Sequence, residues 1–206
     1  MFNGEKMILA MGHTIFEEKL RGQLPNFLIY PEFFDSKKDL LQGNYHNYIR
    51  KLWTLRKEIK VALYPDYVYT ILPLPKEIEY IIPVHEINER IVSLYNDLIN
   101  KGYKIWLGYA SAPKFRDYTI LEFNEFSKKL NTKTWYLGIS TWREFKEALQ
   151  WNFDGIDITT MLLGKFEQIK NYDYVKRRIT ELLQLISKPQ GRQSSILEFF
   201  PLNWGV

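Results

Sequence analysis

Acidic side chains and one histidine recur at the ends of short apolar runs in this sequence, where they could do acid–base or nucleophilic chemistry. They are Glu32, Asp35, Asp66, His85, Glu86 and Asp157, with polar neighbours at 109–111, Ser140 and 158–160. If the runs are parallel strands, these ends meet on one rim, which is where α/β proteins place their chemistry. We therefore expect a site centred on carboxylates there. Taken singly, each residue could also be an ordinary helix cap.

The apolar runs that must position these residues alternate with helical patterns. We expect strands over residues 7–11, 27–34, 61–69, 80–84, 104–109, 134–139 and 155–158. Several are apolar on both faces, as buried parallel strands are. Helices are predicted from Ile87 to Gly102, from a capping box at Thr141, over 39–56 with a break at Gly43, and around Ile179.

Six or seven such βα units leave two architectures, an open doubly wound sheet or a (β/α) barrel. No glycine-rich phosphate loop follows an early strand, which weakens the nucleotide-binding sheet. The prediction is an α/β fold, a small or incomplete (β/α)8 TIM-like barrel over residues 1–187 with a flexible tail over 188–206. Because a full barrel needs about 250 residues, the 206 residues of this chain predict a trimmed one.

Composition excludes several classes of protein. Hydrophobic residues make up 46% of the chain and aromatic residues 16%, which argues against disorder. Because the chain has no cysteine, disulfide scaffolds, zinc fingers, iron–sulfur clusters and cysteine nucleophiles are impossible. We see no apolar run long enough to span a membrane and no secretory signal, so we expect a cytoplasmic protein without membrane contact. We also expect no metal and no cofactor, and the residue usage is compatible with a thermophilic host.

The tail carries the most specific motif of the chain. Residues 193–200 read Gln-Ser-Ser-Ile-Leu-Glu-Phe-Phe. In one tight helical turn, Ile196, Phe199 and Phe200 would share a face and form an apolar plug. The motif resembles the PIP box, the peptide by which replication and repair proteins bind the sliding clamp PCNA, and this resemblance implies a polar pocket for Gln193. The alternative is that these side chains pack against the barrel as a final strand or helix.

Six stretches, in order, resemble the strands of the tRNA-guanine transglycosylase superfamily, which includes relatives that place 7-deazaguanine bases in DNA. They are residues 34–36, 61–66, 81–85, 106–109, 135–140 and 154–157. The resemblance implies an irregular (β/α)8 barrel that exchanges a guanine base through a covalent Asp–ribose intermediate. It also implies DNA as the partner, with tRNA as the alternative.

Carried over residue by residue, the resemblance assigns catalysis to Asp157 and Asp35. Asp35 matches the acid of the family's Asp-Ser-Gly segment, in which Lys37 and Lys38 replace the glycines. In the family's Gly-Val-Asp-x-x-Asp, the second Asp attacks the sugar. That position is Thr160 here, which leaves Asp157 as the candidate nucleophile. Asp35 is then the acid–base group.

The same resemblance gives the substrate-binding assignments. Asp66 matches a carboxylate that recognises the base edge, and a carboxylate can accept both hydrogens of a guanine N1–H and amino group. His85 stands where the family has Gln before Gly. Gly108 keeps one of two glycines and Tyr109 replaces the second. Tyr67 is one of several aromatic residues that could stack on an extruded base.

Three functions are consistent with these features. The first is a sliding-clamp-associated, nucleic-acid-acting protein that resembles a guanine/7-deazaguanine transglycosylase. The second is a non-catalytic PCNA-binding protein built on a degenerate barrel of this type, which Thr160 favours. The third is an unrelated small barrel enzyme whose tail merely packs. Basic residues within 50–60 and at 176–178 could contact a nucleic-acid backbone, although such clusters are commonly a solvated helix surface.

Overall fold

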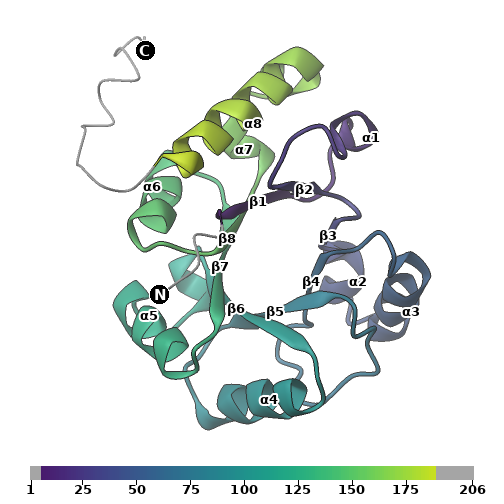
Figure 1. The fold of residues 1–206 in the computed structure, drawn as a ribbon, viewed down its shortest axis with the longest axis vertical. Helices are drawn as coiled ribbons and strands as arrows, with labels where there is room; N and C mark the ends of the chain where they lie inside the picture. Colours follow the sequence, from purple (N-terminus) through teal and green to yellow (C-terminus); the bar gives the residue numbers. More distant parts are fainter. Residues whose placement is uncertain (1–5, 189–206) are drawn as a thin grey trace.

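Eight parallel strands form a nearly closed ring in the computed structural model, which describes residues 6–188 (Figure 1). The strands are β1 (Ile8–Met11), β2 (Phe27–Ile29), β3 (Phe33–Phe34), β4 (Val61–Leu63), β5 (Glu79–Val84), β6 (Lys104–Ala110), β7 (Lys133–Ile139) and β8 (Gly155–Ile158). They are paired in the order β2-β1-β8-β7-β6-β5-β4-β3. The ladder is open only between β2 and β3, so the fold is the predicted α/β TIM-like barrel.

Helices surround the ring on its outer side (Figure 1). They are α1 (Glu17–Leu20), α2 (Lys37–Leu41), α3 (Tyr45–Leu55), α4 (Glu89–Asn100), α5 (Ile120–Lys129), α6 (Trp142–Gln150), α7 (Thr160–Leu163) and α8 (Tyr172–Ser187), with 3-10 turns η1 (Pro113–Phe115) and η2 (Gln168–Lys170). No helix separates β2 from β3, and α1 and α7 have four residues each. The barrel therefore keeps all eight strands and is shortened in its connections.

Two predicted strands are shorter than expected. The stretch 27–34 is two strands, because Pro31, which follows a cis peptide bond, has no backbone N–H to donate to the ladder. The stretch 61–69 is a strand only to Leu63, and Pro65 follows two residues later. The expectation that Glu32 lies at the carboxyl-end rim was wrong. Glu32 precedes β3, and its backbone oxygen accepts the N–H of Val61 at 3.0 Å, at the amino end of β4.

Local sequence signals account for the helix boundaries. Gly43, with φ +64°, separates α2 from α3, and Gly102, with φ +83°, follows α4, because glycine adopts positive φ without a Cβ clash. Thr141 and Glu144 form the predicted capping box of α6. A second capping box, Thr119 with Glu122, begins α5. This helix was not predicted from the sequence.

Two hydrophobic layers divide the side chains of the strands. The outer layer lies between the ring and the helices. The inner layer fills the barrel and consists of Ala10, Leu28, Phe33, Val61, Ile81, Trp106 and Trp135. The Trp135 indole is fully buried and forms the centre of this plug, since its ring stacks parallel to Phe33 and meets Trp106 edge-on, both at 5.4 Å between centroids.

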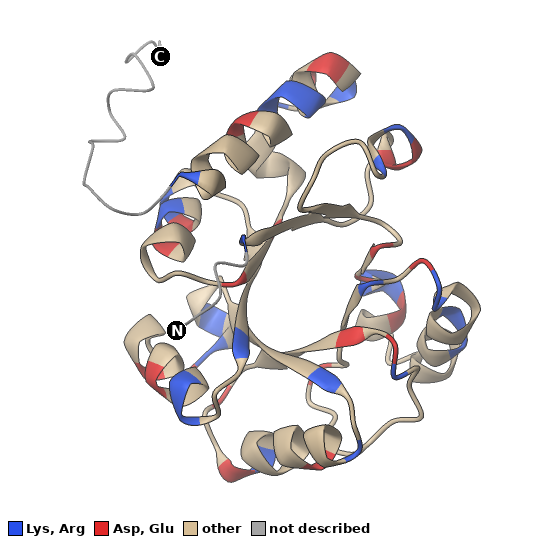
Figure 2. Ribbon diagram, in the orientation of Figure 1, with Lys and Arg blue, Asp and Glu red and all other residues tan. Residues whose placement is uncertain are grey.

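Charged residues lie mostly on helices, loops and strand ends (Figure 2). Between residues 6 and 188, no helix is both long and apolar enough to cross a membrane.

Candidate active site

Asp157 lies inside the barrel, directly above the Trp135 plug. It pairs in register with Ala10, an inner-layer residue, so its side chain points into the barrel. The Trp135 indole N–H donates to Oδ1 at 2.9 Å and the Gly138 backbone N–H donates to Oδ2 at 3.1 Å. The residue is only 7% exposed. Burial, together with the negative charge of Asp35, raises the pKa of Asp157 to about 7.

Asp35 directly follows β3, and its carboxyl group shares this end of the barrel. It is two residues beyond the inward-facing Phe33 and therefore on the same face. Its Oδ2 lies 3.6 Å from the Lys37 ammonium. Its Oδ1 is buried and accepts no hydrogen bond from any described residue. Burial raises the pKa of Asp35, and the positive charges of Lys37 and His13 oppose that rise.

The two carboxyl groups thus share a buried site in unequal surroundings. Asp157 has both oxygens hydrogen-bonded and a lysine only at longer range, whereas Asp35 has a lysine beside it and one unpartnered oxygen. Lys37 favours the ionised form of Asp35, whereas burial and the charge of Asp35 raise the pKa of Asp157 to about 7, although the two N–H donors oppose that rise. Such a division gives one nucleophilic or ion-stabilising carboxylate and one proton donor.

Asp66 and His85 lie at the same end of the barrel, on the loop after β4 and at the end of β5. The His85 Nε2–H donates to Asp66 Oδ1 at 2.8 Å, and the Tyr67 ring stacks on the imidazole with centroids 4.5 Å apart. The charge of Asp66 also contributes to the raised pKa of Asp35. The predicted Asp35, Asp66, His85 and Asp157 are therefore all brought to one mouth.

Gly108 and Tyr109 are placed differently from that mouth. A Cβ on Gly108 would lie 2.7 Å from side-chain atoms of Ile81 and Leu137, so this glycine is explained by packing inside the barrel. Tyr109 points outward and is 1% exposed, among the rings of Phe123 and Phe153. Alternation along the strand puts adjacent residues on opposite faces, so we leave Tyr109 out of the proposed site.

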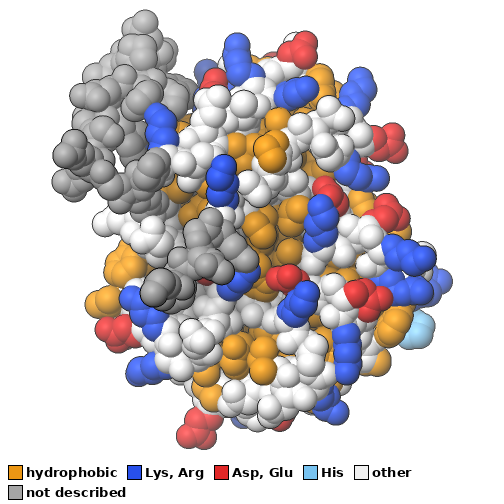
Figure 3. Space-filling model, in the orientation of Figure 1, with side chains coloured by type: hydrophobic (Ala, Val, Ile, Leu, Met, Phe, Trp, Pro, Cys, Tyr) orange, Lys and Arg blue, Asp and Glu red, His pale blue; other side chains and the backbone are white. Residues whose placement is uncertain are grey.

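A cavity of about 780 Å³ lies at the opposite, amino end of the strands. Figure 3 shows this end, with hydrophobic side chains at the centre of the face and charged ones around them. Its rim charges are largely paired, as in Lys60 with Glu32 at 2.7 Å and Arg56 with Glu77 at 3.4 Å. The cavity contains none of the candidate catalytic residues, and we do not assign it to the active site.

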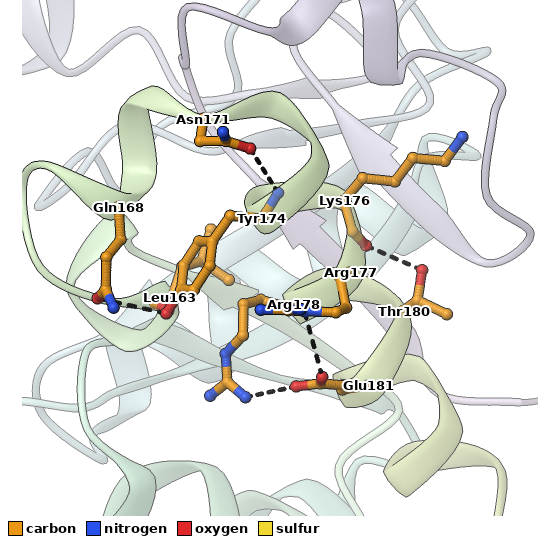
Figure 4. Close-up of polar contacts among 9 residues, drawn as sticks. All are labelled: Leu163, Gln168, Asn171, Tyr174, Lys176, Arg177, Arg178, Thr180 and Glu181. Carbon is orange, nitrogen blue, oxygen red and sulfur yellow. Dashed lines mark hydrogen bonds and ion pairs between the residues drawn. The ribbon is translucent and has the colours of Figure 1, made fainter.

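The basic cluster of α8 is partly engaged inside the protein. Arg177 and Arg178 both reach Glu181, as Figure 4 shows. The Arg178 side chain is 14% exposed and lies over the Trp142 ring. On α3, Lys51 is bonded to the buried Asp39 at 2.6 Å. These contacts reduce the charge that either helix could offer to a phosphate backbone.

Sequence reasoning missed the groups that set the environment of the two carboxylates. Trp135 and Gly138 were read only as parts of a strand, although they supply both hydrogen bonds to Asp157. The sequence signal for this environment was Gly138, a glycine inside a predicted strand. In the structure its φ is +71°, and it lies at a register shift between β7 and β8. The motif residues Gln193, Ile196, Phe199 and Phe200 lie outside the described residues. Within 6–188, no group of three or more His, Asp or Glu side chains could hold a metal ion.

Comparisons with known proteins identify a relative of unknown function. The chain is 43% identical, over 195 residues, to "Uncharacterized protein ORF192" of Acidianus two-tailed virus. That alignment covers 92% of this chain and 98% of the viral protein. The sequence matches no protein-family model.

Proposed function

This chain belongs to the same protein family as the uncharacterized protein ORF192 of Acidianus two-tailed virus, and we propose that it is a base-exchanging transglycosylase acting on nucleic acid and recruited by the sliding clamp. The observation that carries the proposal is the unequal carboxyl pair, Asp35 and Asp157, above the Trp135 plug. Pairs of this kind carry out glycosyl transfer, in which one carboxylate attacks the sugar and one acid protonates the leaving group.

In the proposed reaction, the Asp35 carboxylate attacks C1′ of the target nucleotide and forms a glycosyl ester. The C1′–N bond breaks, its electron pair stays on the departing base, and Asp157 gives that base its proton. The incoming base then returns a proton to Asp157 and attacks C1′, which releases Asp35. These roles are the reverse of those that the family resemblance implies. Asp35 takes the nucleophilic role because its Oδ1 has no hydrogen-bond partner among the described residues. Asp157 takes the acid role because burial raises its pKa to about 7.

In this proposal, Asp66 and Tyr67 receive the base at the mouth of the barrel. The Asp66 side chain is 45% exposed, and its carboxylate can accept hydrogen bonds from a guanine-type N–H edge. The Tyr67 ring is 61% exposed and can stack on a base that has left its helix. His85 serves the base only through these neighbours, because both of its ring nitrogens are already hydrogen-bonded within the protein.

Incorporation of labelled guanine into duplex DNA, single-stranded DNA and tRNA tests the proposal. Wild type should exchange base into at least one of these, and Asp35→Asn and Asp157→Asn should each lower the rate by about 10²- to 10⁴-fold. Asp154→Asn is the matched control, since Asp154 lies at the amino end of β8 and is exposed. The proposal fails if wild type exchanges no base, or if the control loses as much activity as the two site variants.

A second candidate is a non-catalytic, clamp-binding protein on a degenerate barrel. The observation that favours it is Thr160, which begins α7 where the resembling family has its attacking Asp. A hydroxyl there is a poor nucleophile without an adjacent base. Clamp binding by a chain that exchanges no base would select this function.

A further inference from the structure

Both ring nitrogens of His85 face atoms that can only accept a hydrogen bond. Nδ1 lies 2.7 Å from the backbone oxygen of Phe115, and Nε2 lies 2.8 Å from Oδ1 of Asp66. A neutral imidazole carries one N–H and could satisfy only one of these acceptors. With the second proton, both contacts become donated hydrogen bonds, and the one to Asp66 is also an ion pair.

We propose that His85 is held as an imidazolium, and that this cation links the loops after β4, β5 and β6 at the mouth of the barrel. We call this arrangement the His85 bridge. The inference goes beyond the base exchange proposed above and does not depend on it. Asp66 supplies the loop after β4, His85 the end of β5, and Phe115 the loop after β6. The bonds span 19 and 30 residues of sequence, so they join segments that no local turn connects.

The Tyr67 ring also belongs to the His85 bridge. It lies nearly parallel to the imidazole, with an interplanar angle of 14° and a centroid distance of 4.5 Å. A cation over the face of a tyrosine is favourable, whereas a neutral ring gains less. Tyr67 has φ +57°, a left-handed conformation that a bulky residue adopts at a cost. Its contact with His85 can offset that cost, which couples the loop backbone to the charge on the imidazole.

The charged groups around His85 favour its protonated form. Asp66 faces it from the loop after β4, and Glu86 follows it in its own loop. From the loop after β6, Asp117 donates its backbone N–H to the His85 carbonyl at 3.2 Å. The Arg116 guanidinium on that loop is turned away, to the backbone oxygens of Ala110 and Tyr118 at 2.9 Å. The nearest facing side-chain charges are therefore negative.

The pH direction follows from this arrangement. The hydrogen bond to Asp66 raises the pKa of His85 above its ordinary value of 6.5, although burial opposes the rise. Because this pKa is raised, the His85 bridge contributes its full stabilisation of the loops below about pH 6.5. That stabilisation is lost as pH rises through the pKa of His85 in the folded protein. The loops should therefore loosen on the alkaline side.

Proton NMR titration and hydrogen exchange of the whole chain test the His85 bridge. The three histidines give separate ring signals, and His46→Gln, an exposed control on α3, assists assignment. His85 should titrate above 6.5, and Asp66→Asn should lower that value. At equal pH, His85→Gln should speed amide exchange in residues 64–70 and 113–117 relative to wild type, about tenfold for each unit by which the pKa is raised.

The ratio of the exchange rates, His85→Gln over wild type, depends on pH only if the protonated form of His85 holds the loops. A histidine with a merely structural role would give the same ratio at every pH. The ratio should be largest near about pH 6 and fall to a lower value near about pH 9, where wild type has lost the second proton and keeps only one of the two hydrogen bonds. A ratio that is the same at both pH values would overturn the proposal. So would a His85 pKa at or below its ordinary value in wild type, a result that does not require any variant to fold.

Discussion

At the residue scale, the proposed chemistry depends on how differently two similar side chains, Asp35 and Asp157, are surrounded. Asp157 has two N–H donors, which favour its ionised form, yet burial and the charge of Asp35 outweigh them. Asp35 is equally buried but has Lys37 at 3.6 Å. The raised pKa of Asp157, about 7, has a measurable consequence for stability.

Asp157→Asn should flatten the pH dependence of the free energy of unfolding. The pKa of Asp157 is 3.8 in the unfolded chain and about 7 in the folded protein, so stability falls as pH rises from about 3.8 to about 7. The slope is at most about 1.4 kcal/mol per pH unit. Urea unfolding at about pH 5 and about pH 8 measures it. Asp154→Asn should keep the wild-type slope, and a wild-type slope in Asp157→Asn would contradict the assignment.

The residues of the site were only partly predictable from the sequence. Asp35 and Asp157 could be chosen because each ends or nearly ends a short apolar run. The direction of a side chain depends on exact strand boundaries, and a one-residue error reverses it. That is why Glu32 was placed at the wrong end of the barrel and Tyr109 was assigned to a site it faces away from. The Trp135 contact depends on packing across the barrel, which periodicity does not report.

At the scale of elements, β7 and β8 are fitted around one large side chain. A Cβ on Gly155 would lie 2.2 Å from Cε3 of Trp135, closer than atoms can approach. Gly155 therefore leaves the space in which the indole lies flat across the barrel. Because the indole N–H also donates a hydrogen bond to Asp157, the packing of these two strands also sets the environment of the buried Asp157 carboxyl group.

Gly155→Ala should displace the Trp135 indole and destabilise the protein by about 1–3 kcal/mol, as overpacking of a core does. Denaturant unfolding measures the loss, and a change in the near-ultraviolet circular dichroism of tryptophan reports the displacement. Gly12→Ala is the control, since a Cβ there would meet only Asp35 Oδ2, at 4.0 Å. Equal stability of the two variants would show that the contact is relieved without cost.

Removing the helix caps should destabilise their helices, because the first turn then loses a partner for its backbone N–H groups. Thr119→Ala and Thr141→Ala each remove the hydroxyl of a complete capping box, on α5 and α6. Each should cost about 1 kcal/mol in thermal or urea unfolding. Thr180→Ala is the control, because that hydroxyl bonds the Lys176 carbonyl within α8 and alanine is the better helix former. A loss as large in the control would mean that the cap is not the cause.

Element types were more predictable than their ends. The hydrophobic stripe of α4, its end before Gly102 and the break at Gly43 were all readable, because each is a local signal. Strand ends depended on pairing partners elsewhere in the chain. The stretch 27–34 has the composition of one strand, but pairing with β1 ends at Ile29 and pairing with β4 begins at Phe33. A single sequence does not contain that information in local form.

At the scale of the whole molecule, the barrel is small because its connections are short. Only three residues join β2 to β3, where other neighbouring strands are joined by helices or long loops. The amino-end cavity and the carboxyl-end mouth lie on opposite sides of the Trp135 plug. Binding at one end therefore need not disturb the other.

If the PIP-box-like motif of residues 193–200 binds the sliding clamp, binding to the clamp and folding of the barrel should be separable in the full chain. Phe199→Ala/Phe200→Ala should then abolish binding to purified clamp in a calorimetric titration, because two of three apolar contacts are lost. The same double variant should change the free energy of unfolding by less than about 0.5 kcal/mol.

The opposite result would identify the other role of the tail. If these aromatic side chains pack against the barrel as a last structural element, the double variant should lose about 3–5 kcal/mol per buried ring, and wild type should not bind the clamp. Gln193→Ala separates the two cases further. It removes a polar contact that the clamp-binding interpretation requires and that a buried apolar strand or helix would not use. Weaker clamp binding with unchanged stability in Gln193→Ala supports recruitment, whereas unchanged binding would contradict it.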